Sequence, residues 1–354
     1  MCAAAPFGRS LDLKVRSGIK KLAVPVPALV TLAVLVLCVC VGSVYIPVGK
    51  VLSTVWNGIL GRPQSGAAVS IILRVRLPRA LCAMLCGSAL SLSGAAMQGL
   101  LRNPLADGST LGVASGASLG AASAILMGIR FPLIPLAGTM VMAILFAFLS
   151  LTVILALAFA MDRSLATHTI ILIGIIYTMF VSSVMSLLVT FSGEKLRSIT
   201  FWTMGSFSGT DYPQVLILLG TLLVCGAGLV TLSPELNAFS GGEKNAAHLG
   251  VNVKAVRLVV LVLVSVMVGV CVSVGGSVAF VGLVVPHILR RLTGPDHRVL
   301  LPACVFGGAV FLMLCDLCAR TLLSPVELPV GVVTSMIGAA VFVVIFYRTR
   351  KGVR

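Results

Sequence analysis

The residues able to bind or react lie mostly where apolar runs begin or end. Arg76 and Arg79 flank a Leu-Pro pair before a long apolar stretch, and Arg320 follows another. Cations at such places either extend toward water and anchor a helix end or present a docking surface to an acidic partner. The residues alone leave both interpretations open.

Asp316 lies inside an apolar run, where an ionisable side chain is by default a candidate functional residue. Arg320 follows one helical turn later, and the acid on the N-terminal side is the favourable order for an ion pair. We therefore expect a structural ion pair near the outer surface, with a proton-coupling carboxylate as the alternative.

Histidine and cysteine supply no complete metal site. His287 follows a helix broken by Gly275-Gly276 and Pro286, and no partner ligands are spaced around it. The pairs Cys82/Cys86 and Cys315/Cys318 each share a helical face, but no second pair or nearby histidine completes a ligand set. We expect no metal, and we interpret these cysteines as small apolar packing residues.

The most hydrophilic loop covers residues 233–253. Pro234 and Gly241-Gly242 divide it into two short helical pieces, Glu235–Phe239 and Glu243–Leu249. Two short helices in a water-side loop suit insertion into a groove of a cytoplasmic protein. An ordinary amphipathic loop is the alternative.

Composition places these residues in a membrane protein. The chain has 354 residues, 58% hydrophobic and 10% charged, with a mean hydropathy of +1.13, whereas soluble domains carry about 25% charged residues. No hydrophilic stretch is long enough for an appended soluble or nucleotide-binding domain. The net charge of +16 fits anionic lipid rather than nucleic acid, because no basic face is interleaved with aromatic residues.

Apolar runs predict about ten spans, each needing roughly 20 residues. The second span carries many small residues, which predicts burial among other helices, and residues 45–75 before it are expected outside the membrane. Lys and Arg are more numerous on the side that carries both termini, so we expect a basic cytoplasmic arm (1–21), one permease domain (22–347) and a basic cytoplasmic tail (348–354). The predicted spans are 22–44, 79–98, 109–128, 134–160, 169–191, 214–232, 254–274, 276–289, 299–319 and 329–347.

Six motifs occur along the chain: RLPR at 76–79, GAAMQGLLRNPLADGSTLGVASGA at 94–117, WTMGSF at 202–207, LNAFSGGEKNAAHLGVNV at 236–253, GSVAFVGLVVPHILRRLTGPDHR at 276–298 and ELPVGVVTSMIGA at 327–339. In this order they resemble the FecCD family, the BtuC-like permease subunits of ABC importers for iron chelates, haem and cobalamin. The resemblance covers essentially residues 30–350.

The resemblance implies an all-α integral membrane protein with the type II ABC importer permease fold. It implies a second permease subunit, in a homo- or heterodimer, two cytoplasmic ATPase subunits and an extracytoplasmic substrate-binding protein. ATP and Mg²⁺ would be bound by the ATPase, so we expect no catalysis and no cofactor in this chain. Its surroundings would be the lipid of the cell membrane, and no nucleic acid is expected.

The resemblance also suggests roles for particular residues. Arg76, Arg79 and Arg320 match positions that face acidic residues of the binding protein. Loop 233–253 matches the helices that sit on the ATPase, although Gly241-Gly242 stands where the family usually has Leu-Gly. The expected coupling residues are Leu236, Asn237, Gly242, Glu243, Ala247, Leu249 and Gly250, and Asn103, Leu105, Thr167 and His168 match the family's narrow cytoplasmic end of the pathway. Ser182 and Ser186 are expected pathway residues for another reason: they lie in a polar stripe along the fifth span, with hydroxyls that bond only to the backbone as the alternative.

The resemblance predicts a permease subunit of a binding-protein-dependent ABC importer, with the translocation pathway at the dimer interface. The expected cargo is a ferric siderophore because that cargo is frequent in the family, and haem and cobalamin are the alternatives. A function of another class is ion-coupled secondary transport through Asp316. An intramembrane enzyme is disfavoured because the sequence offers no convincing nucleophile–base pair or metal cluster.

Overall fold

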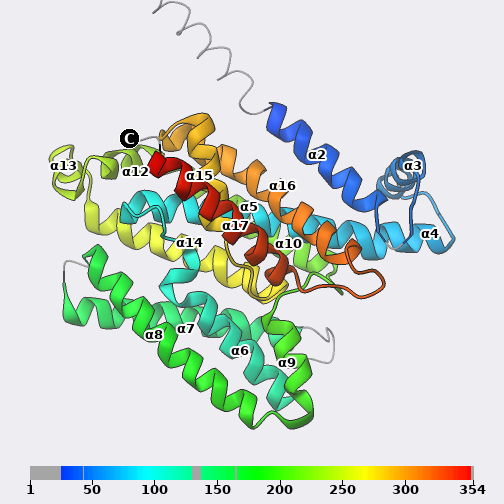
Figure 1. Ribbon diagram of the computed structural model, residues 1–354, viewed down its shortest axis with the longest axis horizontal. Helices are drawn as coiled ribbons and strands as arrows, with labels where there is room; N and C mark the ends of the chain where they lie inside the picture. Colours follow the sequence, from blue (N-terminus) through cyan, green and yellow to red (C-terminus); the bar gives the residue numbers. More distant parts are fainter. Residues whose placement is uncertain (1–24, 43, 130–136, 164–165, 352–354) are drawn as a thin grey trace, which may run out of the picture.

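The computed structural model describes residues 25–42, 44–129, 137–163 and 166–351, and the elements within these ranges are all helical (Figure 1). The predicted arm 1–21 and the last three residues of the predicted tail lie outside them.

In order, the elements are α2 (Pro25–Cys40), α3 (Val48–Ile59), α4 (Ala67–Ser70), the π-helical turn η1 (Ile71–Arg76), α5 (Leu77–Leu101), the 3₁₀ turn η2 (Gly108–Leu111), α6 (Val113–Met127), α7 (Ala137–Met161) and α8 (Thr167–Thr190). There follow the 3₁₀ turn η3 (Gly193–Lys195), α9 (Leu196–Thr203), α10 (Tyr212–Thr221), the π-helical turn η4 (Leu222–Gly226), α11 (Ala227–Thr231), α12 (Ser233–Ser240), α13 (Glu243–His248), α14 (Val253–Gly275), α15 (Val281–Thr293), α16 (His297–Thr321) and α17 (Val330–Lys351).

Helix α5 is the centre of the bundle and packs against α10, α14, α15 and α16. Small residues make this possible, since side chains at Gly87 and Gly94 would collide with the backbones of Gly308 in α16 and Gly282 in α15. The predicted burial of this span is confirmed, because 89% of the residues in its most apolar 18-residue stretch are buried. Close backbone approach supplies the van der Waals contact that lipid cannot replace.

The structure agrees with about ten spans. Among the described residues, six helices are long and apolar enough to cross a membrane, and Val26–Cys40, Val113–Met127 and Val330–Val344 are shorter apolar helices. The eighth predicted span, 276–289, corresponds to α15. The break before it is also present, because α14 ends at Gly275 and both Gly276 and Phe280 have positive φ, 70° and 68°.

The helix of the second span begins earlier than its expected start at residue 79. It is continuous from Ala67, so residues 67–75 belong to the same helix as α5. Pro78 has no N–H and its ring would clash with a carbonyl one turn earlier in a regular α-helix. The wider π-helical turn at Ile71–Arg76 directly before α5 accommodates it without ending the helix.

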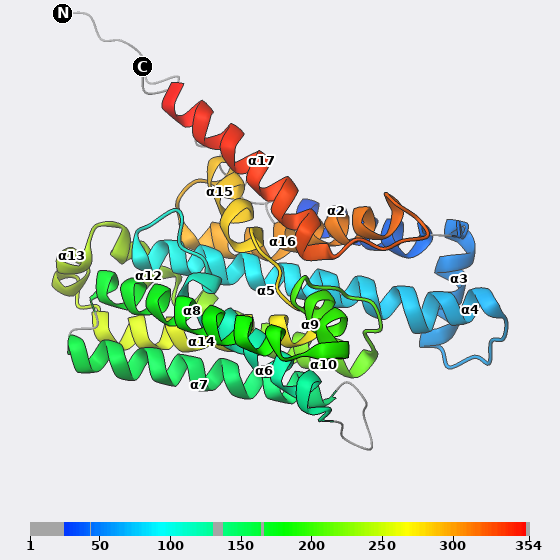
Figure 2. The same ribbon diagram turned by 60° about the horizontal axis from the view of Figure 1, so that its bottom comes forward.

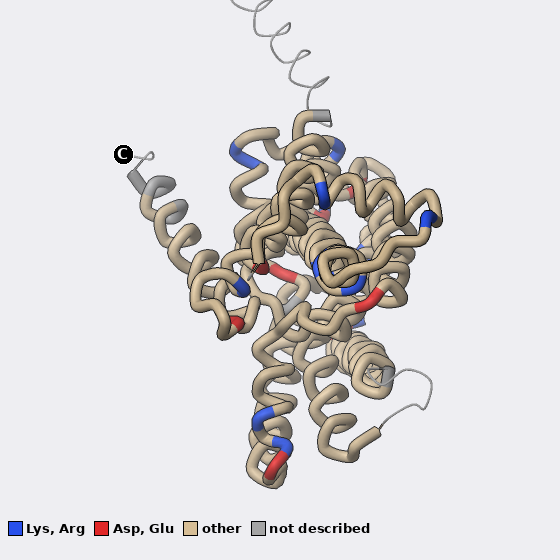
Figure 3. The backbone as a smooth tube through the Cα atoms, turned by 90° about the vertical axis from the view of Figure 1, so that its right-hand side faces the viewer, with Lys and Arg blue, Asp and Glu red and all other residues tan. Residues whose placement is uncertain are grey.

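The two ends of the bundle differ. Helices α12 and α13 lie at the left in Figures 1 and 2, whereas α3 and α4 lie at the right. Figure 3 looks onto the α3–α4 end and shows that most of the chain is neither acidic nor basic, with the few charges in small groups.

Candidate functional site

Five charged residues gather at the α3–α4 end, and we call them the arginine cluster: Arg76, Arg79, Asp316, Arg320 and Glu327. Arg79 is its centre, with Nη2 2.9 Å from Asp316 Oδ1 and Nη1 2.9 Å from Glu327 Oε2. The expected pair of Asp316 and Arg320 is present, with Oδ2 and Nε 3.5 Å apart. Asp316 is 2% exposed, so two guanidinium groups compensate one buried carboxylate.

The other contacts of the arginine cluster hold the end of α2. Arg76 Nη1 donates to the carbonyls of Val39 and Cys40 at 3.0 and 2.9 Å, and Nη2 donates to Val44. Arg320 Nη2 donates to the carbonyl of Cys38. These carbonyls belong to the last turn of α2 and the segment after it, where no intrahelical donor is available.

The docking role of Arg76, Arg79 and Arg320 stays a prediction. Each residue is 7% exposed, and the guanidinium groups bind partners within the chain. Glu327, with a side chain 44% exposed, is the accessible member of the cluster. It also lines a cavity of about 520 Å³ that opens to solvent, together with Ser198, Phe201, Trp202, Gly205, Ser206, Ser208, Val274, Gly276, Leu328 and Pro329.

At the opposite end, α12 and α13 confirm the two short helices predicted within loop 233–253. The coupling residues suggested by sequence divide into two groups. Ala247, Leu249 and Gly250 are exposed, Leu249 by 74%. Leu236 is buried, and the side chains of Asn237 and Glu243 bind other helices; Gly242 precedes α13 with φ 104°.

Asn237 ties α12 to the start of α16. Its Oδ1 accepts from the backbone N of His297 at 2.9 Å and lies 2.8 Å from His297 Nδ1, and its Nδ2 donates to Asp296 Oδ1 at 2.7 Å. Asp296 also caps α16 by accepting from the N–H of Arg298. Helix α16 therefore runs directly from α12 to Asp316 and Arg320 at the other end of the bundle.

Glu243 ties α13 to two further helices. Its Oε1 accepts from Thr167 Oγ1, the first residue of α8, at 3.0 Å, and it also forms an ion pair with Arg257 of α14. Burial raises the pKa of the Glu243 carboxyl, but the hydrogen bond and charge of Arg257 outweigh it, with smaller contributions from Thr167 and Arg102. The pKa consequently lies below its ordinary value of 4.5.

This shift predicts how pH acts on the attachment of α13. Because the folded pKa is below the unfolded one, the ion pair contributes its full stability above about pH 4.5 and loses it as pH falls through the folded pKa. We expect the difference in melting temperature between the native chain and Glu243→Gln to stay constant down to that pH and then shrink. A difference that widens on acidification contradicts the assignment.

The predicted gate residues are brought together only in part. Asn103, Leu105 and Ala106, in the turn after α5, line a groove with Ile171, Ile175, Thr178 and Met179 of α8. Thr167 and His168 lie at the start of the same helix but do not line the groove. Ser182 and Ser186 are exposed further along α8, and the hydroxyl of Ser186 donates to the Ser182 carbonyl at 3.0 Å. The gate therefore stays a prediction.

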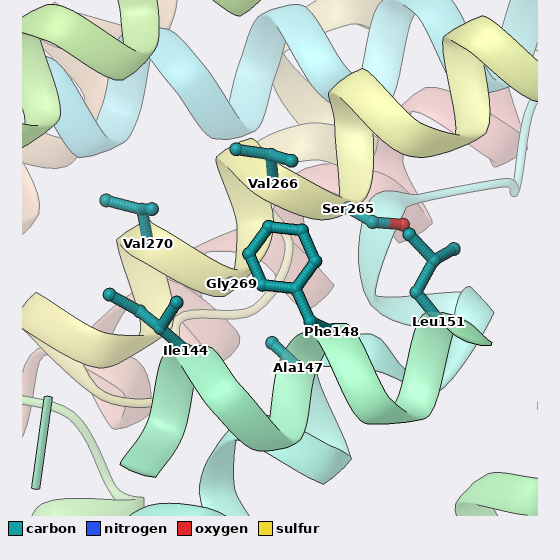
Figure 4. Close-up of a pocket in the computed structure, with 8 residues that line it drawn as sticks. All are labelled: Ile144, Ala147, Phe148, Leu151, Ser265, Val266, Gly269 and Val270. Carbon is teal, nitrogen blue, oxygen red and sulfur yellow. The ribbon is translucent and has the colours of Figure 1, made fainter. Parts of the chain in front are cut away.

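Other polar and reactive residues have structural surroundings. No group of three or more possible metal ligands occurs among the described residues, and the His287 ring lies edge-on to Phe342, 6.5 Å between centroids. The cysteines of the described ranges are free thiols within the protein. Figure 4 shows a small recess between α7 and α14, where Phe148 extends over Gly269; its lining is apolar apart from Ser265.

Sequence reasoning missed three contacts: Arg79 with Glu327, Asn237 with His297, and Glu243 with Thr167. Glu327 and Glu243 were conspicuous as acids in a basic chain. No periodicity, however, links residues that are 76 or 248 positions apart.

Comparison with known proteins places this arrangement among transport permeases. The model of the FecCD transport family matches residues 30–348. The vitamin B12 import system permease protein BtuC of Klebsiella pneumoniae is 39% identical over 91% of this chain and 92% of its own length. The molybdate import system permease protein MolB of Haemophilus influenzae is 38% identical over 80% of this chain and 82% of its own length. A solved inward-facing structure of an ABC transporter assigned to the metal-chelate type has a TM-score of 0.80 and 34% identity, covering 95% of this chain and 99% of that one.

Proposed function

Because this chain belongs to the FecCD transport family, we propose that it is the permease subunit of a binding-protein-dependent ABC importer for a ferric siderophore. The family match along nearly the whole chain carries the importer assignment. The multi-pass helical bundle agrees with it. Family membership also argues against ion-coupled transport through Asp316, whose carboxylate is already paired with two arginines.

The chemistry of the cavity beside the arginine cluster supports a large chelate as cargo. Among the described residues, its lining combines the aromatic rings of Phe201 and Trp202 with three serine hydroxyls and the carboxylate of Glu327, and it contains no lysine or arginine. Such a wall suits an organic chelate that presents both apolar and hydrogen-bonding surfaces. A small oxyanion such as molybdate would find no cationic side chain in this lining. The similarity to a metal-chelate type transporter supports the same class; haem and cobalamin remain the alternative cargoes.

We place the translocation pathway beside α8, between this subunit and a second permease subunit. Only 22% of the residues in the most apolar 18-residue stretch of α8 are buried within the chain. On this helix, the side chains of Ile175 and Met179 are 49% and 66% exposed. Cargo released at the α3–α4 end would pass along α8 to the groove at Asn103 and Leu105, with Thr167 and His168 at its exit.

The orientation follows from the two ends. We place α12 and α13 in the cytoplasm together with both termini. Ala247, Leu249 and Gly250 then form an exposed surface for one of two ATPase subunits, which bind ATP and Mg²⁺. The binding protein docks at the opposite end, on the surface above the arginine cluster.

The function is tested in liposomes that contain this chain with its partner ATPase and substrate-binding protein. We expect ATP hydrolysis and uptake to rise when the binding protein carries a ferric siderophore. Stimulation only by haem, cobalamin or molybdate would reassign the cargo and leave the importer class intact. Failure of the ATPase to associate, or uptake by this chain alone under an ion gradient, would overturn the importer assignment.

A further inference from the structure

A single carboxylate connects the proposed ATPase-binding loop to the helix that lines the proposed pathway. Glu243 is the first residue of α13, and Thr167 is the first residue of α8. The 3.0 Å hydrogen bond from Thr167 Oγ1 to Glu243 Oε1 joins these two helix ends directly. The side chain of Glu243 is used for contacts within the chain, whereas Ala247 and Leu249 of the same segment are exposed.

Arg257 fixes the position of this carboxylate. It is 1% exposed, lies in the first turns of α14 and pairs with the same Oε1 atom that accepts from Thr167. The positive charge of Arg102, at the end of α5, also favours the ionised form of Glu243. A buried guanidinium orients a carboxylate strongly, because displacement of the carboxylate would leave the cation uncompensated.

Helix α8 is suited to move when α13 moves. It lies at the edge of the bundle, and only 22% of the residues in its most apolar stretch are buried. Residues of α8 one to three turns beyond Thr167 form one wall of the groove opposite Asn103 and Leu105. Helix α12, by contrast, is attached through Asn237 to α16, which packs along the central helix α5. The two short helices therefore hold different parts of the bundle.

We propose that Glu243 is the positioning residue that transmits movement of α13 to the first turn of α8 and so opens the groove at Asn103 and Leu105. This inference rests on the proposed importer function. In it, Arg257 holds the carboxylate in place, and the Thr167 hydroxyl is the point at which α8 is pulled. Asn237 serves the separate attachment of α12 to α16.

The experiment compares uptake per ATP hydrolysed in liposomes containing the complete importer. Thr167→Val removes the hydroxyl donor and keeps the side-chain shape, so we expect uptake per ATP to fall at least tenfold while ATPase association persists. Thr167→Ser keeps the donor and should restore coupling to within about twofold of the native chain. Thr152→Val, at an exposed threonine of α7 whose hydroxyl donates only to its own helix, is the matched control.

Glu243 is varied in parallel. Glu243→Ala should uncouple uptake at least as strongly as Thr167→Val, because it removes the ion pair with Arg257 together with the hydrogen bond from Thr167. The double variant should be no worse than Glu243→Ala alone, because the contact with Thr167 is already lost in that variant. Glu243→Gln, which keeps an acceptor oxygen but loses the charge, should show a smaller loss.

The outcomes separate this inference from the function on which it rests. Normal coupling in both Thr167→Val and Glu243→Ala would overturn the inference, while uptake by the native importer would leave the proposed function standing. Loss of ATPase association in Glu243→Ala, with Thr167→Val fully coupled, would show that Glu243 belongs to the ATPase seat. Absence of ATP-driven uptake by the native importer would be a failure of the proposed function itself.

Discussion

Asp316→Ala should cost the folded chain about 3–5 kcal/mol, the range measured when one partner of a buried ion pair is removed. The carboxylate is 2% exposed and lies between Arg79 and Arg320, which are each 7% exposed. Its removal leaves two guanidinium groups close together in a site with little water. Repulsion between them adds to the cost of desolvation.

Unfolding of the purified protein in detergent, followed by intrinsic fluorescence, would measure this loss. Glu327→Ala is the matched control, because it removes a carboxylate from the same Arg79 but at a side chain that is 44% exposed. Exposed pairs contribute about 0–1 kcal/mol, so this variant should unfold almost like the native chain. Equal stability of the two variants would contradict the buried role of Asp316.

Arg76→Leu should be the second most damaging change, with an expected loss of about 1–3 kcal/mol, the cost of leaving a buried acceptor such as the Val39 carbonyl unpaired. The guanidinium supplies donors to Val39, Cys40 and Val44, and Gly42 leaves the space in which it packs. Its removal should release the last turn of α2 and make the chain between α2 and α3 sensitive to protease.

Arg74→Leu is the control for Arg76→Leu, because Arg74 lies in the same helical turn and is exposed. Arg76→Lys should recover part of the loss, as one ammonium group cannot reproduce the geometry of a guanidinium. The same variants test docking. Native stability and protease resistance in Arg76→Leu, together with lost binding-protein association, would show that Arg76 serves the partner and not the fold.

Much of the architecture follows from local sequence. The apolar runs, the small residues of α5 and the breaks at Gly241-Gly242 and Gly275-Gly276 specified where helices form and which of them is central. The ion pair of Asp316 with Arg320 was predictable for the same reason, because residues four apart share one face of a helix. Motifs in a fixed order indicated the family, and the family match agrees with them.

The tertiary structure decided what the charged residues do. Near the ends of helices, a cation can extend to water, meet a partner protein or turn inward, and the sequence favours none of these. Packing of α2 and α16 against α5 placed carbonyls and Asp316 within reach of Arg76 and Arg79, and burial then required that these charges be paired. In the same way, the fold brought Glu243 to Thr167 across 76 residues. Local periodicity determines a helix and its faces, whereas partners from distant segments exist only once the helices have packed.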